Sequence, residues 1–366
     1  MKIITKLAHL SMTKVATTAL AMLAIGSFAN AAQSIFPVVN TVSTVPSNGD
    51  VNPYGVAFVP DTVPVGHVLT PRDILISNFN NSANLQGLGT TITRVDRHGQ
   101  TSTFYTSSSP QTGLTAALGI LSNGWVLIGN LPTLDGTSNT VKPGSLAVLD
   151  ADGKFLGRIG NLATVNGPWG MAVVDDGNGY IGVAHIFVSN VLSGVISRFD
   201  LEYAPGRAFV QSTVIADGFS HRTDPAAIVL GPSGLSYDPH NDILYVASSL
   251  ENAVYQIANA AHATTGQAHT LLFQDLTHLH GPLDMTTLPN GHFLIANSDG
   301  SNADPNQPSE LVEYTREGVF VGQMPVDPNN GGAFGLAVNR LGPDAFRLSA
   351  VDDNQNTLTS WTVVSR

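Results

Sequence analysis

The chain has 366 residues, no cysteine, and 27 acidic against 16 basic residues, a formal net charge of −11. Without cysteine it has no disulfide framework, no thiolate metal site and no cysteine nucleophile. The acidic balance also argues against nucleic acid as a partner, because nucleic-acid-binding surfaces concentrate positive charge.

The first 31 residues have the pattern of a secretory signal peptide. Three lysines within the first 14 residues precede an apolar run over residues 15–28, and Ala29 and Ala31 supply the small residues of a cleavage site. The apolar run is shorter than the roughly 20 residues that a spanning helix needs. We therefore predict cleavage after about Ala31, a periplasmic or secreted location, and no membrane insertion.

Residues 32–366 are predicted to form one domain. No Ser/Gly/Pro-rich linker or charge run divides them, and closed β architectures often keep such lengths in one domain. Removing the signal would also remove three lysines and leave 13 basic residues against 27 acidic ones. We expect this acidic domain to act as a monomer.

A segment built around a glycine recurs along residues 50–364. Residues 52–58, 167–173 and 231–237 share a Pro-x-Gly core, and the remaining copies vary it. The register positions of the copies are Gly55, Gly119, Gly170, Gly234, Asp284 and Gly335. Their separations of 64, 51, 64, 50 and 51 residues are far longer than the coils of a β-helix.

Each copy is followed by two further segments rich in β-branched and aromatic residues, which predict strands. The second strands are expected at residues 73–78, 125–130, 185–190, 243–248, 292–297 and 346–351. The third strands are expected at residues 91–96, 145–150, 194–200, 253–257, 310–314 and 358–363. Turns and a fourth strand follow several of them. The sequence thus predicts an all-β protein, a six-bladed β-propeller with four-stranded antiparallel blades.

The last repeat ends with only three recognisable strands, whereas residues 36–43 precede the first repeat and belong to none. An open propeller would expose the edge of a sheet. We therefore predict that the N-terminal strand completes the last blade and closes the ring.

The Pro-x-Gly segments and the asparagines that end the second strands resemble those of NHL-repeat propellers, and more loosely of SMP-30/gluconolactonase-like propellers. The resemblance covers residues 50–364. It implies the six-bladed fold, in a superfamily that contains scaffolds, lactonases and lyases.

In such a propeller, the loops entering the first strands and those leaving the second strands open on one face, the channel mouth. Polar and aromatic groups at these positions are our candidate ligand-binding residues: Asn52, Asn78, Asn130, Asn166, Trp169, Asn190, His280, Asn297 and Asp352. The alternative is that asparagine ends a strand because its side chain bonds the neighbouring backbone.

Amide and carboxylate oxygens on one axis would suit Ca²⁺. The resemblance to calcium-dependent lactonases implies a glutamate at the position of Asn52, which this chain lacks, and leaves Asn190, Asn297 and Asp352 as possible metal ligands. Zinc-binding relatives use imidazoles instead, and here only His280, with His221 and Asp224, could approach such a site.

Two functions remain open. The first is an exported module that binds a small-molecule or protein ligand at the channel mouth. The second is a Ca²⁺- or Zn²⁺-dependent, lactonase-like hydrolase or lyase acting at the same mouth. The sequence contains no Gly-x-Ser-x-Gly nucleophile motif, phosphate loop or dinucleotide fingerprint, so catalytic residues are not identified.

Overall fold

The computed structural model describes residues 38–364, apart from residues 110, 265 and 304–308. The predicted signal peptide lies outside these residues. All of them belong to one compact unit, Pro37–Arg366. Among the described residues, no helix has the length and apolar character that crossing a membrane requires.

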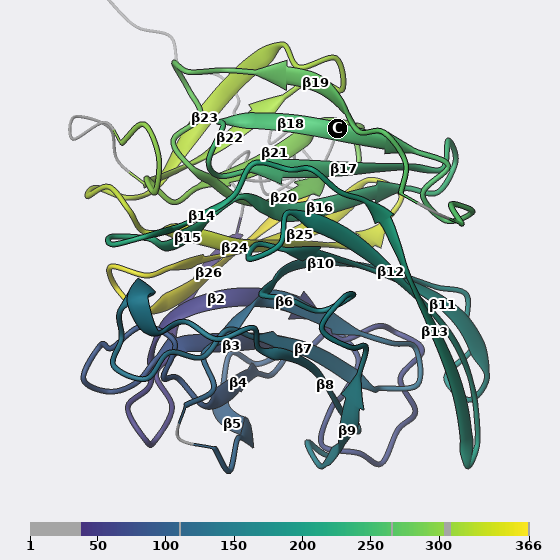
Figure 1. The fold of residues 1–366 in the computed structure, drawn as a ribbon. Coiled ribbons are helices and arrows are strands. Elements are labelled where there is room, and N and C mark those ends of the chain that lie inside the picture. Colours follow the sequence, from purple (N-terminus) through teal and green to yellow (C-terminus); the bar gives the residue numbers. More distant parts are fainter. Residues whose placement is uncertain (1–37, 110, 265, 304–308, 365–366) are drawn as a thin grey trace, which may run out of the picture. The chain divides into compact units, whose positions relative to one another are not determined.

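Four-stranded antiparallel sheets make up most of the described structure (Figure 1). Six such sheets and one two-stranded sheet occur within residues 38–364 outside the gaps. The first strand of each four-stranded sheet contains one of the register positions found in the sequence. These first strands are β2 (Val51–Phe58), β6 (Leu114–Ile120), β10 (Pro168–Asp175), β16 (Pro232–Asp238), β20 (Pro282–Thr287) and β24 (Ala333–Gly342).

The other strands follow in the predicted order. The second strands are β3 (Ile74–Asn80), β7 (Val126–Asn130), β11 (Gly182–Asn190), β17 (Ile243–Ser248), β21 (Phe293–Asn297) and β25 (Ala345–Asp352). The third strands are β4 (Thr91–Val95), β8 (Ser145–Leu149), β12 (Val195–Ala204), β18 (Ala253–Ala258), β22 (Ser309–Tyr314) and β26 (Thr357–Val364). The outer strands are β5 (Thr101–Thr106), β9 (Phe155–Ile159), β13 (Arg207–Ala216), β19 (Thr270–Gln274), β23 (Phe320–Asp327) and β1 (Val38–Ser43).

The sheet with strand order β1-β26-β25-β24 joins the beginning of the described chain to its end. β1 pairs antiparallel with β26 over its whole length, from Val38 opposite Thr362 to Ser43 opposite Thr357. The segment that belonged to no repeat is therefore the outer strand of this sheet, as predicted.

The first strands lie side by side: β2 contacts β6 and β24, β10 contacts β6 and β16, and β20 contacts β16 and β24. The register glycines allow this close approach. A Cβ added at Gly335 would lie 1.7 Å from the carbonyl oxygen of Tyr54, and one at Gly170 would lie 2.2 Å from that of Ser233. A side chain at either position would force neighbouring strands apart, which explains why the motif recurs.

An aromatic cluster fills part of the space between the first strands. Tyr54 stacks on Phe334 with ring centroids 4.7 Å apart, and its ring lies edge-on to that of Trp169 at 5.4 Å. Phe79 contacts both Tyr54 and Trp169. We call these four side chains the aromatic cluster; they belong to a larger buried apolar core.

Two features depart from the repeat. A short hairpin of β14 (Arg222–Asp224) and β15 (Ile228–Leu230) forms the two-stranded sheet, inserted between the outer strand β13 and the first strand β16 (Figure 1). Strands β11, β12 and β13 have 9, 10 and 10 residues and are longer than their counterparts in most other sheets. One single-turn 3₁₀ helix, η1 (Ser138–Thr140), also lies in the described part of the chain.

Candidate functional site

A pocket of about 310 Å³ lies where β2 begins and the loops after several second strands meet. The β14–β15 hairpin contributes to its wall. We call it the mouth pocket; its lining includes Asn52, Tyr54, Asn80, Asp299, Phe334 and Asp353. The volume is at the lower end of the range for pockets that bind small molecules.

Two aromatic rings and the hairpin supply the apolar part of the lining. Tyr54 and Phe334 line the pocket and form the stacked pair of the aromatic cluster. Ala226 and Ala227 belong to the turn of the hairpin, and the backbone oxygen of Ala226 accepts a hydrogen bond from Gln86 Nε2 at 3.3 Å. Since residues 86 and 226 are far apart in the sequence, this bond links the hairpin to the loop after β3.

Two buried amides of the pocket lining have oxygen atoms without a hydrogen-bond partner among the described residues. Asn52 is 5% exposed and Asn80 is 3% exposed, and Oδ1 of each is unpaired. Asn80 Nδ2 donates to Asn84 Oδ1 at 2.7 Å, which fixes the orientation of the amide. An unpaired buried acceptor costs about 1–3 kcal/mol, so both oxygens favour a ligand that donates hydrogen bonds.

The Asp353 carboxyl lines the pocket and has a raised pKa. Burial, and then the neighbouring charge of Asp352, raise its pKa to about 7. No described residue donates a hydrogen bond to this carboxylate. Burial and the same carboxylate raise the pKa of the Tyr54 phenol, so the two side chains are close enough to interact. A carboxyl that titrates near neutral pH can take up or release a proton there.

Most of the predicted strand-end residues act as caps instead of lining the pocket. Oδ1 of Asn190 and Asn297 each accept a backbone N–H from the loop that enters the first strand of the same sheet, at 2.8 and 3.1 Å. Asn78 and Asn130 bond to the third strands of their sheets. The alternative interpretation of strand-ending asparagines accounts for Asn130, Asn190 and Asn297, whereas Asn78 lies inside β3 and bonds to threonine hydroxyls.

The remaining predicted residues lie in different surroundings. Trp169 is 1% exposed inside the aromatic cluster, and His280 is 3% exposed with its Nδ1 bonded to a backbone oxygen. Asp352 Oδ1 accepts a backbone N–H at 3.3 Å, and Asn166 is partly exposed but does not line the mouth pocket. Of the nine candidates, Asn52 alone lines it.

Sequence reasoning missed three lining residues by one or two positions. Asn80, Asp299 and Asp353 follow the predicted Asn78, Asn297 and Asp352 closely in the chain. In each case the predicted strand-end side chain bonds to its own sheet or to an adjacent loop, and a later residue lines the pocket. In the sequence, the signal for these lining residues was a second polar residue one or two positions after the predicted strand end.

The residues proposed as metal ligands do not fit a metal ion. Within the described part of the chain, no group of three His, Asp or Glu side chains is placed to hold one. The amide oxygens of Asn190 and Asn297 already accept backbone N–H groups. His221 Nδ1 bonds the backbone oxygen of Phe219 at 2.9 Å. We therefore derive no reaction step through Ca²⁺ or Zn²⁺.

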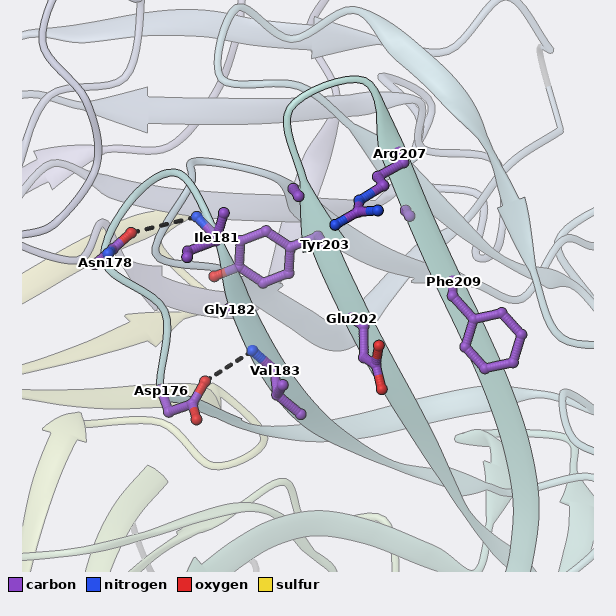
Figure 2. Close-up of a pocket in the computed structure, with 11 residues that line it drawn as sticks. Asp176, Asn178, Ile181, Gly182, Val183, Glu202, Tyr203, Arg207 and Phe209 are labelled. Atoms are coloured by element: carbon purple, nitrogen blue, oxygen red, sulfur yellow. Dashed lines mark hydrogen bonds between the residues drawn. The ribbon is translucent and has the colours of Figure 1, made fainter.

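A second, larger pocket of about 650 Å³ lies along the extended β11–β13 strands. Figure 2 shows that Glu202, Arg207 and Phe209 line it from β12 and β13. Asp176 Oδ1 accepts the backbone N–H of Val183 at 2.7 Å. This groove contains both acidic and basic side chains, and its Asp176 already accepts a hydrogen bond. The mouth pocket is therefore the stronger candidate.

Stability should fall as pH rises from about 4 to 8. The pKa values of Asp284, Asp352 and Asp353 are raised to about 7, 6 and 7, in each case chiefly because burial penalises the charged carboxylate. The ordinary pKa of an aspartate is about 3.9, so the folded chain binds more protons than the unfolded chain across this window. The urea midpoint should therefore be higher at pH 5 than at pH 8.

The Asp353→Asn variant is the control for this pH dependence. It removes one of the three carboxyls, so its midpoint should change less between pH 5 and pH 8 than that of the natural chain. A midpoint that rises over this range in the natural chain would contradict the assignment.

No protein-family model matches the chain, and no curated protein matches it in sequence. Several solved structures resemble it in fold. A gluconolactonase from Xanthomonas campestris is 13% identical, with a TM-score of 0.55 over 91% of this chain and 92% of that one. Regucalcin from Agrobacterium tumefaciens, a calcium-binding protein, is 14% identical, with a TM-score of 0.49 over 88% of this chain and 95% of that one. The chain thus has the β-propeller fold of gluconolactonase-like proteins, as the sequence resemblance predicted.

Proposed function

We propose that this chain is an exported, monomeric, six-bladed propeller that binds a small polar ligand in the mouth pocket. Support for six blades comes from the six four-stranded sheets of the described residues and from the order in which their first strands contact one another. Pairing of β1 with β26 supports a closed ring. The charged start and apolar run of residues 1–31 support export.

The unpaired amide oxygens of Asn52 and Asn80 carry the ligand proposal. Water can satisfy such groups, but a ligand with hydroxyl or N–H donors would do so while its apolar face lies against Tyr54 and Phe334. Sugars and sugar lactones combine a hydroxyl-rich edge with an apolar ring face. A compound of this size also suits the pocket of about 310 Å³.

Replacing Asn80 with leucine should weaken ligand binding and leave the fold intact. The substitution removes one acceptor from the pocket, and a lost buried hydrogen bond of about 1–3 kcal/mol corresponds to a roughly 5- to 150-fold weaker affinity. Titration calorimetry with a panel of monosaccharides and sugar lactones measures this change. Melting temperature should stay near that of the natural chain, because the Oδ1 that is lost has no partner and water can replace the Nδ2 bond to the exposed Asn84.

Asn78→Leu is the matched control, only two residues away. Asn78 is fully buried and donates to the hydroxyls of Thr91 and Thr93, so this variant should lose stability. If Asn80→Leu binds every panel member as tightly as the natural chain, the mouth pocket is not the binding site.

Hydrolysis of a lactone is the second candidate function. The observation that favours it is the Asp353 carboxyl, whose pKa near 7 allows it to act as a general base at neutral pH. In this proposal Asp353 takes a proton from a water molecule as the water oxygen bonds to the lactone carbonyl carbon. The ring C–O bond then breaks, and Asp353 returns the proton to the leaving oxygen, which gives the open hydroxy acid. The amide nitrogen of Asn52 and the Tyr54 hydroxyl are the nearby groups that can hold the substrate. The gluconolactonase fold adds support for this kind of enzyme.

A further inference from the structure

The charges around the mouth pocket are unbalanced. Asp299 and Asp353 both line it, and among the described lining residues there is no lysine, arginine or histidine. Asp299 accepts the backbone N–H of Gly331 and so is held by the protein. Asp353 has no such donor among the described residues, and the charged group that acts on its pKa is another carboxylate, Asp352.

Elsewhere among the described residues, buried or partly buried aspartates have cationic partners or accept hydrogen bonds, as Asp50 does from Thr90 and Thr91. Asp73 pairs with Arg94 at 2.6 Å, and Asp200 with Arg198 at 2.7 Å. A partly buried carboxylate without a partner is costly, because burial penalises its charge. The pocket therefore lacks a positive charge that a ligand can supply.

The other acceptors of the pocket indicate which kind of cation fits. Oδ1 of Asn52 and Oδ1 of Asn80 are unpaired and at least nine-tenths buried, and Asp353 adds a carboxylate. A primary ammonium group carries three N–H donors and no acceptor.

We propose that the ligand of the mouth pocket carries a primary ammonium group, which binds the Asp353 carboxylate and the amide oxygens of Asn52 and Asn80. This inference rests on the proposed function of the pocket and adds the charge of the ligand. A metal ion is a poorer occupant, because no three His, Asp or Glu side chains of the described residues converge on one point. An anion would meet two carboxylates and no positive side chain in the described lining.

Three sugars that differ mainly in charge test the inference: glucosamine, glucose and gluconate. Calorimetric titration of the full-length mature protein at pH 7 and low salt should give an affinity for glucosamine at least tenfold above that for glucose. Gluconate should give no measurable binding. The Asp353→Asn variant, which keeps the shape of the side chain and removes its charge, should lose the preference for glucosamine.

Glu202→Gln is the matched control, since it removes one carboxylate from the groove of Figure 2, which shares no lining residue with the mouth pocket. It should keep the preference. Equal affinity for glucose and glucosamine would overturn the ammonium inference and leave the pocket as a binding site. Displacement of glucosamine by Ca²⁺ alone would also overturn it, in favour of a metal. Absence of binding by all three sugars would contradict both the inference and the proposed function.

Discussion

Replacing Trp169 with alanine should lower the free energy of unfolding by about 3–5 kcal/mol, the usual cost of truncating a fully buried large aromatic side chain. Trp169 is 1% exposed, and its ring packs against those of Tyr54 and Phe79 at 5.4 and 5.5 Å. Truncation would leave a cavity beside side chains from several sheets, so no single strand could move to fill it. Urea denaturation monitored by fluorescence of the remaining tryptophans measures the loss.

Trp125→Ala is the comparison for this variant. Trp125 is only partly buried, and it packs at the edge of a different apolar cluster, with its ring 5.9 Å from that of Tyr203. Its truncation should therefore cost clearly less. A larger loss at Trp125 than at Trp169 would mean that the aromatic cluster contributes little to stability.

Removing residues 38–43 should cause the second large effect, a loss of many degrees in melting temperature or outright aggregation. Without β1, the edge of β26 would lose its antiparallel partner and expose unpaired N–H and C=O groups. Differential scanning calorimetry and size-exclusion chromatography of the truncated protein measure the two outcomes.

A synthetic peptide with the sequence of residues 36–48 provides the control. Added in excess, it should restore the melting temperature in a concentration-dependent way, because a ligand that binds only the folded chain stabilises it. An unchanged melting curve after truncation would mean that β1 is dispensable.

Much of the fold could be predicted because its spacing requirements appear directly in the sequence. Gly170 and Gly335 stand where a Cβ would collide with the neighbouring first strand, so the fold demands glycine there. Asp284 occupies the same position in β20 and accepts the backbone N–H of Leu336 at 3.0 Å, a bond that reaches the neighbouring first strand β24. Such constraints recur once in each sheet, so they can be found by comparing the sequence with itself.

The mouth pocket was harder to predict because its features do not repeat. The hairpin that carries Ala226 and Ala227 occurs once and matches no repeat copy. Its Ile228 has a φ of +63°, unusual for a β-branched residue, which no local sequence rule anticipates. Asn78 and Asn80 look alike in the sequence, yet Asn78 bonds to threonine hydroxyls of β4 and Asn80 lines the pocket. Tertiary context alone separates the two roles.

The sheet that combines β1 with β24, β25 and β26 has a consequence for how the chain folds. Its partners Thr41 and Thr359 are 318 residues apart, so this sheet cannot form until nearly the whole polypeptide has been made. Contacts over such distances close slowly, because the entropy of a very long loop must be lost first. The other sheets form from consecutive strands and can fold earlier. We therefore expect the pairing of the two ends to be a late step in folding, and a window in which the edge of β26 is open to other chains.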